Sequence, residues 1–249
     1  MSDPPPQNIY DDPEFFAGYS RLERFGAGWR GAYEHPAFMA LLPEIAGKRV
    51  LDLGCGVGQL AQHLALQGAA DVIGVDLSER MLALARAEYS HPRVAFQRAS
   101  MEEAVFPPGR FDLVVSAFAF HYVADLADLC RRIATWLAPG GTLVFTNEHP
   151  VYLSRATSEG WVRDADGQKL YWALDRYGEE GLREETWITE GVQKYHRMVS
   201  TILNDVIQAG LAVERVDEPL PDAEMLRRHP NWITLRKAPF CLLVRARKA

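Results

Sequence analysis

The segment from Val50 to Leu60 constrains the fold of this chain more than any other part of the sequence. An apolar, β-branched run, VLDL, leads into the glycine-rich turn GCGVG, and the pattern after it predicts a helix over Gln59 to Leu66. A second apolar run, DVIGVD, ends on Asp76, whose carboxylate can accept both hydroxyls of a ribose. This strand, turn, helix and strand order is typical of a doubly wound α/β fold that binds an adenosine-containing ligand at the glycine turn.

The turn also separates two classes of ligand. A dinucleotide fingerprint, G-x-G-x-x-G, needs its third glycine at position 59, where this chain has Gln59. Asp52, at the end of the first strand, would face a pyrophosphate and repel it. S-adenosylmethionine carries an ammonium and a sulfonium, so it suits acids at both Asp52 and Asp76, whereas NAD suits only Asp76. The sequence therefore favours S-adenosylmethionine as the cofactor and disfavours a nucleotide-dependent oxidoreductase.

The residues around this turn resemble the class I S-adenosylmethionine-dependent methyltransferases over roughly residues 48 to 150. The loop DLSERML is similar to the acidic loop of that family, and FDLVVS and LAPGGTLVF are similar to its fourth and fifth strands. Later segments, including EHP and KYHR, resemble a bacterial subgroup of small-molecule type. The family commonly has an aspartate at the position of Ser100, so this chain departs from the pattern there.

The resemblance implies a fold and a set of cofactor contacts. The fold is an α/β, Rossmann-like doubly wound sheet of seven strands, in which the last strand is antiparallel and inserts between its neighbours. Leu77 and Met81 would pack on the adenine, and Ser100 and Met101 would lie at its edge. The candidate cofactor-binding residues are Asp52, Gly54, Gly56, Gly58, Asp76, Leu77, Met81, Ser100, Met101, Ser116 and Tyr19.

The chain is expected to form a single methyltransferase domain with two additions to its core. The expected parts are a flexible tail (1–8), a helical cap (9–47), a cofactor-binding core (48–150), a substrate lid (151–193) and the C-terminal part of the core (194–249). The lid segment is rich in aromatic residues and has no clear period, so we expect an irregular cover over the substrate. A helix is expected from about Lys194 to Gln208.

Candidate catalytic residues follow from the reaction that the resemblance implies. Methyl transfer is an in-line displacement that needs a general base only when the acceptor is a neutral hydroxyl. His121 and His149 follow the fourth and fifth strands, where the crevice of a parallel sheet opens. Tyr195 and His196 stand at the start of the helix expected after the lid. A purely structural role stays open for each of the four.

Two further candidates lie in the expected cap. Tyr10 and Arg24, like Tyr19, could reach the cofactor carboxylate or the substrate, although packing and solvent exposure explain them equally well.

Composition narrows the partners. The net charge of -6 argues against a broad nucleic-acid surface, and three cysteines far apart suggest neither disulfides nor a metal site. No apolar run reaches the ~20 residues of a membrane span, and the N-terminus lacks signal-peptide features, so a cytoplasmic protein is expected. The expected oligomeric state is a monomer or a homodimer. The function expected is methyl transfer to an O or N atom of a small molecule. An RNA or protein methyltransferase and a cofactor-binding protein without activity are the alternatives.

Overall fold

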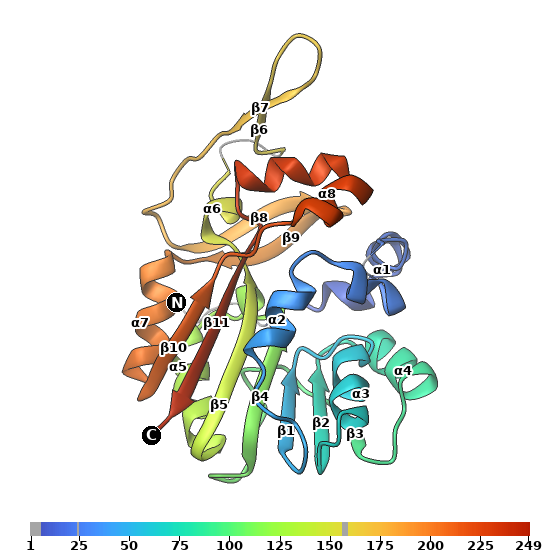
Figure 1. Ribbon diagram of the computed structural model, residues 1–249, viewed down its shortest axis with the longest axis vertical. Helices are drawn as coiled ribbons and strands as arrows, with labels where there is room; N and C mark the ends of the chain where they lie inside the picture. Colours follow the sequence, from blue (N-terminus) through green and yellow to red (C-terminus); the bar gives the residue numbers. More distant parts are fainter. Residues whose placement is uncertain (1–5, 24, 156–158) are drawn as a thin grey trace.

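A seven-stranded sheet forms the body of the protein in the computed structural model, which describes residues 6–23, 25–155 and 159–249 (Figure 1). The strand order is β10-β11-β5-β4-β1-β2-β3, and only β11 runs antiparallel, between β10 and β5. The expected Rossmann-like sheet is confirmed. Its strands are β1 (Arg49–Leu53), β2 (Asp71–Asp76), β3 (Val94–Arg98), β4 (Phe111–Ala117), β5 (Leu137–Glu148), β10 (Leu211–Asp217) and β11 (Cys241–Lys248).

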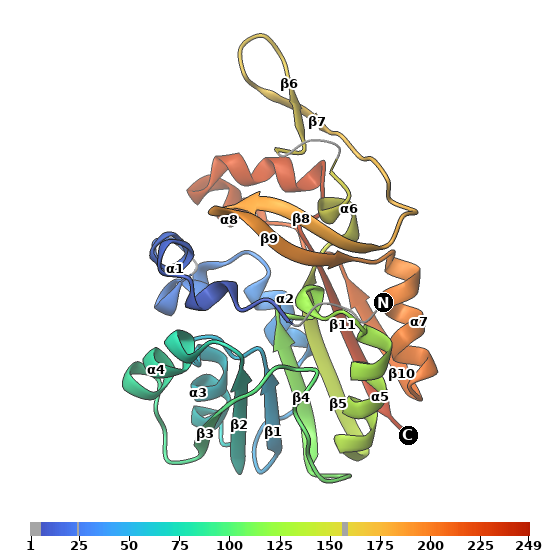
Figure 2. The ribbon, with the colours of Figure 1, turned by 180° about the vertical axis from the view of Figure 1, so that it is seen from behind.

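Helices cover both faces of this sheet and form two apolar cores. One core packs α5 and α7 against the strands, and the other packs α2 and α3 against the opposite face (Figure 2). The buried parallel strands are apolar on both faces because each face carries helices. The helices of the body are α2 (His35–Leu41), α3 (Gln59–Leu66), α4 (Glu79–Glu88), α5 (Leu126–Trp136) and α7 (Val199–Gln208).

The N-terminal region supplies short helices before the first strand. They are η1 (Ile9–Asp11), α1 (Pro13–Tyr19) and η2 (Gly26–Gly31). Asp12 caps α1 by accepting a hydrogen bond from the backbone N–H of Phe15 at 2.8 Å, and Pro13 takes the first helical position, where its missing N–H costs nothing. These helices lie beside the carboxyl ends of β1 and β2 (Figure 1).

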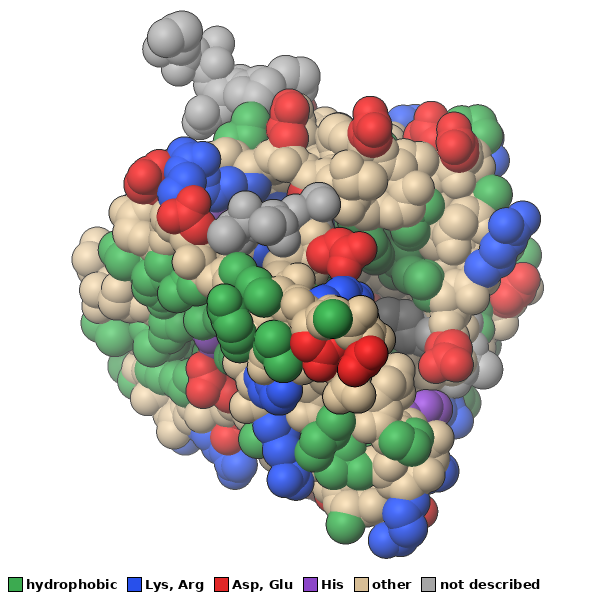
Figure 3. All heavy atoms as spheres, turned by 90° about the horizontal axis from the view of Figure 1, so that it is seen from above, with side chains coloured by type: hydrophobic (Ala, Val, Ile, Leu, Met, Phe, Trp, Pro, Cys, Tyr) green, Lys and Arg blue, Asp and Glu red, His purple; other side chains and the backbone are tan. Residues whose placement is uncertain are grey.

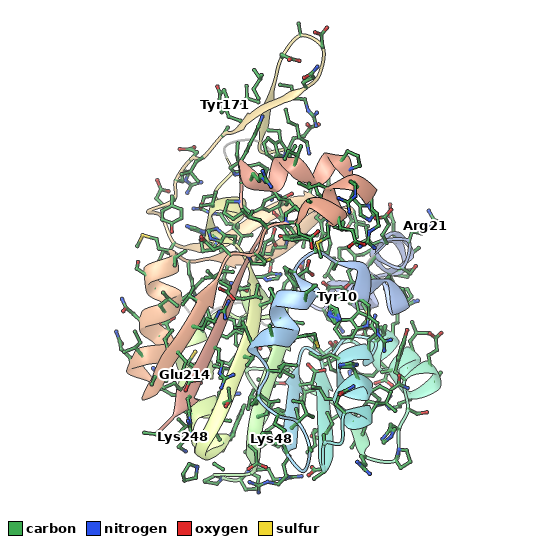
Figure 4. All side chains as sticks on the ribbon, in the orientation of Figure 1. Tyr10, Arg21, Lys48, Tyr171, Glu214 and Lys248 are labelled. Atoms are coloured by element: carbon green, nitrogen blue, oxygen red, sulfur yellow. The ribbon has the colours of Figure 1, made fainter. Side chains whose placement is uncertain are left out.

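The segment after β5 is more regular than its sequence suggests. It contains α6 (Pro150–Leu153) and two antiparallel hairpins, β6–β7 (Trp161–Arg163, Lys169–Trp172) and β8–β9 (Gly181–Trp187, Thr189–His196). The β8–β9 hairpin lies over the carboxyl ends of the sheet strands, and β6–β7 projects away from the body (Figures 1 and 2). Tyr171 on the projecting hairpin is 58% exposed (Figure 4). The expectation of an irregular segment is therefore wrong.

The helix expected from Lys194 is also wrong at its start. Strand β9 continues to His196, and α7 begins only at Val199. The buried residues of this strand alternate as Val192, Lys194 and His196. Because two of the three are polar, the period of two that marks a strand is hidden in the sequence.

Two short elements complete the hairpin end of the molecule. They are α8 (Ala223–Arg228) and η4 (Pro230–Arg236). Elsewhere in the fold, the short helix η3 (Phe120–Tyr122) follows β4. Seen from this end, lysine and arginine side chains stand in separate small groups among acidic and apolar ones (Figure 3). Among the described residues, no helix has the length and apolar character that crossing a membrane requires.

Candidate active site

A cavity of about 600 Å³ lies at the carboxyl ends of β1, β2, β4 and β5. The glycine turn and the loop after β2 form one end of it. The β8–β9 hairpin, η3 and the end of β5 form the other end, and residues 6–10 contribute to its wall. We call the first end the cofactor chamber and the second the acceptor chamber. A cavity of this size, with apolar walls and a few polar groups, is typical of a small-molecule site.

The three glycines of the turn serve different purposes. All three have positive φ, which favours glycine. A Cβ on Gly54 would lie 2.3 Å from the Cβ of Ala119, and one on Gly58 would lie 2.6 Å from the ring of Phe96. A Cβ on Gly56 would meet nothing within 4 Å. Gly54 and Gly56 line the cavity, whereas Gly58 allows the close approach of Phe96 on β3 and lies outside the lining.

Two aspartates at the cofactor chamber differ in their hydrogen bonds. The carboxylate of Asp76 accepts backbone hydrogen bonds from Gly56 at 2.8 Å and from Ser78 at 2.9 Å, so it joins the turn to the start of α4. Asp52 is buried, and its Oδ2 has no hydrogen-bond partner among the described residues. Burial, followed by the nearby charge of Asp76, raises the pKa of Asp52 to about 8. A cationic ligand group at this orphaned oxygen would satisfy it.

Most of the other candidate cofactor residues line the cavity. Leu77, Met81, Ser100, Met101 and Tyr19 all line the cavity. The hydroxyl of Ser100 also accepts a hydrogen bond from the backbone N–H of Glu103 at 3.1 Å.

Ser116 lies outside the cavity lining. Its side chain is fully buried in the sheet, where its Oγ donates to the backbone oxygen of Leu53 at 2.7 Å. A residue near a strand end can point along the sheet rather than into the crevice, and the sequence does not show which.

Of the four catalytic candidates, only His121 lines the cavity. Its Nδ1 lies 3.1 Å from Oδ1 of Asn147, and its Nε2 lies 3.9 Å from Oε2 of Glu148. Burial, reinforced by the positive charge of Lys194, lowers the pKa of His121 to about 3. The ring therefore stays neutral at physiological pH and is a weak general base.

His149, Tyr195 and His196 lie outside the cavity lining. His149 caps α6 by accepting from the backbone N–H of Val151 at 3.1 Å, and its Nε2 lies 2.6 Å from Glu218. The guanidinium of Arg197 lies 5.7 Å from the centre of the Tyr195 ring.

His196 is buried against other polar groups. Its ring lies 3.2 Å from the hydroxyl of Ser154 and 2.8 Å from the backbone oxygen of Tyr177. These contacts fix loops, so the structure does not bring the four catalytic candidates together.

The residue that faces the acceptor chamber at the end of β5 is Glu148, the neighbour of His149. Strand β5 ends at Glu148, and His149 is already the N-cap of α6, so the two neighbouring side chains have different roles. Glu148 accepts from the ammonium of Lys194 at 2.7 Å, and Lys194 also pairs with Glu185. Glu185 in turn pairs with Arg155. None of these four charged residues was among the candidates from the sequence. For Lys194 the reason is that the strand β9 that carries it was interpreted as the start of a helix.

Aromatic side chains complete the acceptor chamber. The hydroxyls of Tyr10 and Tyr122 lie 3.0 Å apart, and the rings of Tyr19 and Trp187 meet edge to face at 5.9 Å. In Figure 4, Tyr10 lies between the sheet and the β8–β9 hairpin. Arg24, the further candidate from the sequence, lies outside the described residues.

Backbone strain marks one cavity residue. Phe118 has a φ of 56°, an uncommon value for a residue with a side chain, and its ring stacks on Phe240 at 5.6 Å. Both rings line the cavity. The sequence carries no signal for this conformation.

The N-terminal strap, residues 6–12, connects the two chambers. Its Asp11 accepts from the hydroxyl of Ser78 at 2.6 Å and from the backbone N–H of Arg80 at 3.0 Å, at the start of α4. Its Gln7 pairs with the backbone of β9, donating to Gly191 and accepting from Gln193, each at 2.9 Å. The strap is therefore held at both ends of the cavity.

Comparisons with known proteins agree with this geometry. A family model described as a methyltransferase domain matches residues 50–141. An S-adenosylmethionine-dependent methyltransferase from Mesorhizobium loti superposes with a TM-score of 0.82 at 42% identity, over 88% of this chain and 99% of that one. An uncharacterized protein of Haemophilus influenzae is 35% identical over 97% of both chains. A ubiquinone biosynthesis O-methyltransferase of Acinetobacter baumannii is 30% identical over 77% of this chain and 71% of its own length.

The sheet order, the glycine turn and the paired acids define the class of protein as a Rossmann-like enzyme that binds an adenosine-containing cofactor. The comparisons specify the family: this chain belongs to the S-adenosylmethionine-dependent methyltransferases. It is an enzyme, and its cofactor is S-adenosylmethionine.

Proposed function

We propose that the protein transfers the methyl group of S-adenosylmethionine to an oxygen or nitrogen atom of a small molecule bound in the acceptor chamber. The observation that carries this proposal is that one continuous cavity joins the glycine turn to a second chamber lined by Glu148, Lys194 and Trp187. A donor and an acceptor held in one cavity meet at an effective concentration far above that in solution.

The cofactor chamber offers a partner for each part of the cofactor. Asp76 would accept hydrogen bonds from the ribose hydroxyls, and the unpartnered oxygen of Asp52 would accept a hydrogen bond from the cofactor ammonium. Leu77 and Met81 would pack on the adenine, with Ser100 and Met101 at its edge. When bound, S-adenosylmethionine supplies an electrophilic methyl group on a sulfonium. Gly56 leaves open the space in which backbone and cofactor approach each other.

The acceptor chamber would orient the nucleophile and exclude water. Phe118, Tyr122 and Trp187 form aromatic walls, and Tyr10 of the strap adds to them through its contact with the hydroxyl of Tyr122. During transfer the sulfonium loses its positive charge and becomes a neutral thioether, so the protein need not stabilise a new charge on sulfur. The main demand on the protein is therefore to align donor and acceptor. Tyr10 and Tyr122 do not serve as bases at neutral pH, because burial raises the pKa of both hydroxyls.

Two alternatives are less well supported. A polymer acceptor such as RNA or protein fits poorly with the net charge of -6 and with a cavity covered by a hairpin and a strap. A protein that binds the cofactor without catalysis would not need a second, charged chamber beside the methyl group.

The test is to add purified protein and S-adenosylmethionine bearing a deuterated methyl group to a cell extract. Small molecules, RNA and protein are then separated and analysed by mass spectrometry. We expect enzyme-dependent label in the small-molecule fraction. Label confined to RNA or protein would contradict the proposal, as would cofactor binding with no labelled product. The Asp76→Ala variant provides the background.

A further inference from the structure

The charges that line the cavity are unequal in number. Among the described residues, six carboxyl groups line it and two side chains carry a fixed positive charge. The carboxyl groups belong to Asp52, Asp76, Glu102, Glu148, Glu159 and Glu185, and the cations are Arg155 and Lys194. The raised pKa of Asp52, about 8, leaves it mostly uncharged at neutral pH, so five carboxyl groups face the two cations. A cavity lined mainly by one sign of charge concentrates ligands of the opposite sign.

Both cations already have partners. The ammonium of Lys194 lies 2.7 Å from Oε2 of Glu148 and also pairs with Glu185, which takes the guanidinium of Arg155 as well. All four side chains are buried or nearly so. An anionic acceptor would therefore have to break a buried ion pair within the described part of the chain. Separating such a pair leaves an uncompensated buried charge.

Glu148 has capacity to spare. Its contacts with Lys194 and with His121 both fall on Oε2, and its side chain lines the cavity. Within residues 6–23, 25–155 and 159–249, the other carboxylate oxygen, Oε1, has no such contact, so it can accept from a donor in the acceptor chamber. An ionised carboxylate is an acceptor only, so its natural ligand there is an N–H or O–H group, and a charged donor binds it most strongly.

The acceptor chamber already stabilises one ammonium group. Lys194 places its Nζ 4.8 Å from the centre of the Trp187 ring, while the two carboxylates hold it from other sides. Carboxylate and aromatic faces together are a favourable environment for a cation. The rings of Tyr10, Tyr19 and Tyr122 line the same cavity and offer more aromatic surface.

We infer that the acceptor is a small amine, which enters as an ammonium and is held by Oε1 of Glu148 against the aromatic walls. This inference rests on the proposed function. The ammonium gives one proton to Oε1 of Glu148, which passes it to solvent. The nitrogen lone pair then forms the bond to the methyl carbon as the carbon–sulfur bond breaks. That electron pair stays on sulfur, so a neutral thioether and a methylated ammonium are the products.

The first arm of the test determines the charge of the natural acceptor. Small molecules that gain the deuterated methyl group in a cell extract are separated on cation and anion exchangers at neutral pH. We expect enzyme-dependent products to be retained by the cation exchanger. Products that are anionic or neutral would overturn the amine inference and leave the methyltransferase function intact. No labelled small molecule at all would overturn the proposed function on which the inference rests.

The second arm tests Glu148 with the partially purified amine fraction as substrate. Glu148→Gln keeps the size of the side chain and an oxygen for Lys194 but removes the charge. We expect the apparent KM for the amine fraction to rise at least tenfold, with the Kd for S-adenosylhomocysteine changed less than threefold. An unchanged KM in a variant with wild-type Tm would contradict the role of Glu148.

A matched control for Glu148→Gln is available on the β8–β9 hairpin. Glu184 is exposed and lies beside Glu185 on β8, but it does not line the cavity. Glu184→Gln makes the same change of charge as Glu148→Gln, but outside the cavity lining, so it should keep the wild-type KM. If Glu148→Gln does not fold, the first arm still decides between an amine and other acceptors.

Discussion

At the scale of single residues, Gly56 is the position where the backbone itself leaves room for the cofactor. An added Cβ would meet no protein atom within 4 Å, and φ is 54°. We expect Gly56→Val to abolish binding of S-adenosylhomocysteine in a protein that still folds, as measured by calorimetry and circular dichroism. Gly167→Val is the control, because Gly167 also has positive φ (79°) and open space but lies in the β6–β7 hairpin. Strain of about 1–2 kcal/mol is common to both variants. Equal loss of binding in both would mean that strain, and not cofactor space, is responsible.

His121 gives a prediction about pH. Its pKa of about 3 in the folded protein lies below the unfolded value of about 6.5, so the unfolded chain binds more protons between these limits. Stability that is present above pH 6.5 is therefore lost as the pH falls toward 3. The contribution from this ring should be about 2 kcal/mol between pH 6.5 and 5. Urea unfolding should show a shallower pH dependence for His121→Gln than for the wild type.

The control for this prediction is His91→Gln, on the loop before β3 and outside the cavity lining. If His121→Gln retains the full acid sensitivity of the wild type, the ring is not held neutral by burial. The same low pKa implies that the rate has no inflection near 6.5 that depends on His121, as a histidine base with an ordinary pKa would produce.

At the scale of elements, the N-terminal strap joins the cofactor loop to the substrate hairpin. Asp11 stabilises the start of α4 because a carboxylate there accepts free backbone N–H groups and complements the helix dipole. We expect Asp11→Ala to weaken binding of S-adenosylhomocysteine by about tenfold, or about 1.4 kcal/mol, since the strap would leave the cavity wall.

Glu79→Ala is the control for the strap. Glu79 is also an acid in the first turn of α4, but its side chain pairs only with Arg86 among the described contacts. Calorimetry should therefore show wild-type affinity for this variant. Hydrogen exchange should show faster labelling of residues 6–12 in Asp11→Ala and no change in Glu79→Ala. Wild-type affinity in Asp11→Ala would remove the strap from cofactor binding.

The inserted segment contains two tryptophans with different surroundings. Trp187 lines the acceptor chamber, whereas Trp172 is 8% exposed, donates to the backbone oxygen of Val151 at 3.0 Å and stacks on Tyr152. We expect Trp187→Ala to raise the acceptor KM by about tenfold with little change in cofactor affinity. Trp172→Ala should instead reduce the free energy of unfolding by about 3–5 kcal/mol.

These two variants also test how the insertion works. Kinetics with the amine fraction and thermal melts separate loss of substrate contact from loss of packing. If Trp172→Ala raised the KM more than Trp187→Ala while leaving Tm unchanged, the β6–β7 hairpin and not β8–β9 would cover the acceptor. The buried ion pair between Lys194 and Glu148 joins β9 to β5. We therefore expect slow hydrogen exchange of the backbone amides of β9 even without ligand.

At the scale of the whole molecule, the sequence specifies the cofactor half of the protein well and the acceptor half poorly. The turn at Gly54 to Gly58 and the acid at Asp76 depend on local backbone chemistry, which a short motif records directly. The seven-stranded order follows from that motif through the family resemblance. The acceptor chamber is assembled from β5, β9 and the N-terminal strap, which are far apart in the chain.

The failures in that half have physical causes. His149 was selected as a histidine that follows the fifth strand, and the sequence does not show that its ring caps α6 while Glu148, one residue earlier, lines the cavity. Lys194 escaped because buried polar residues hide the alternation of β9. The hairpins of the insertion are stabilised by Trp172 packing and by ion pairs across the chain, and no local propensity reports such contacts.

The most direct measurement is a calorimetric titration of the purified chain with S-adenosylhomocysteine and, separately, with NAD. We predict one equivalent of S-adenosylhomocysteine bound with a Kd on the order of 1 µM. Binding should weaken by about 1.5–3 kcal/mol in Asp76→Ala, the scale of losing charged hydrogen bonds in a partly buried site. NAD should bind negligibly, because Gln59 replaces the third glycine of the dinucleotide turn. Tight binding of NAD, or wild-type affinity in Asp76→Ala, would contradict the assignment of this cavity to S-adenosylmethionine.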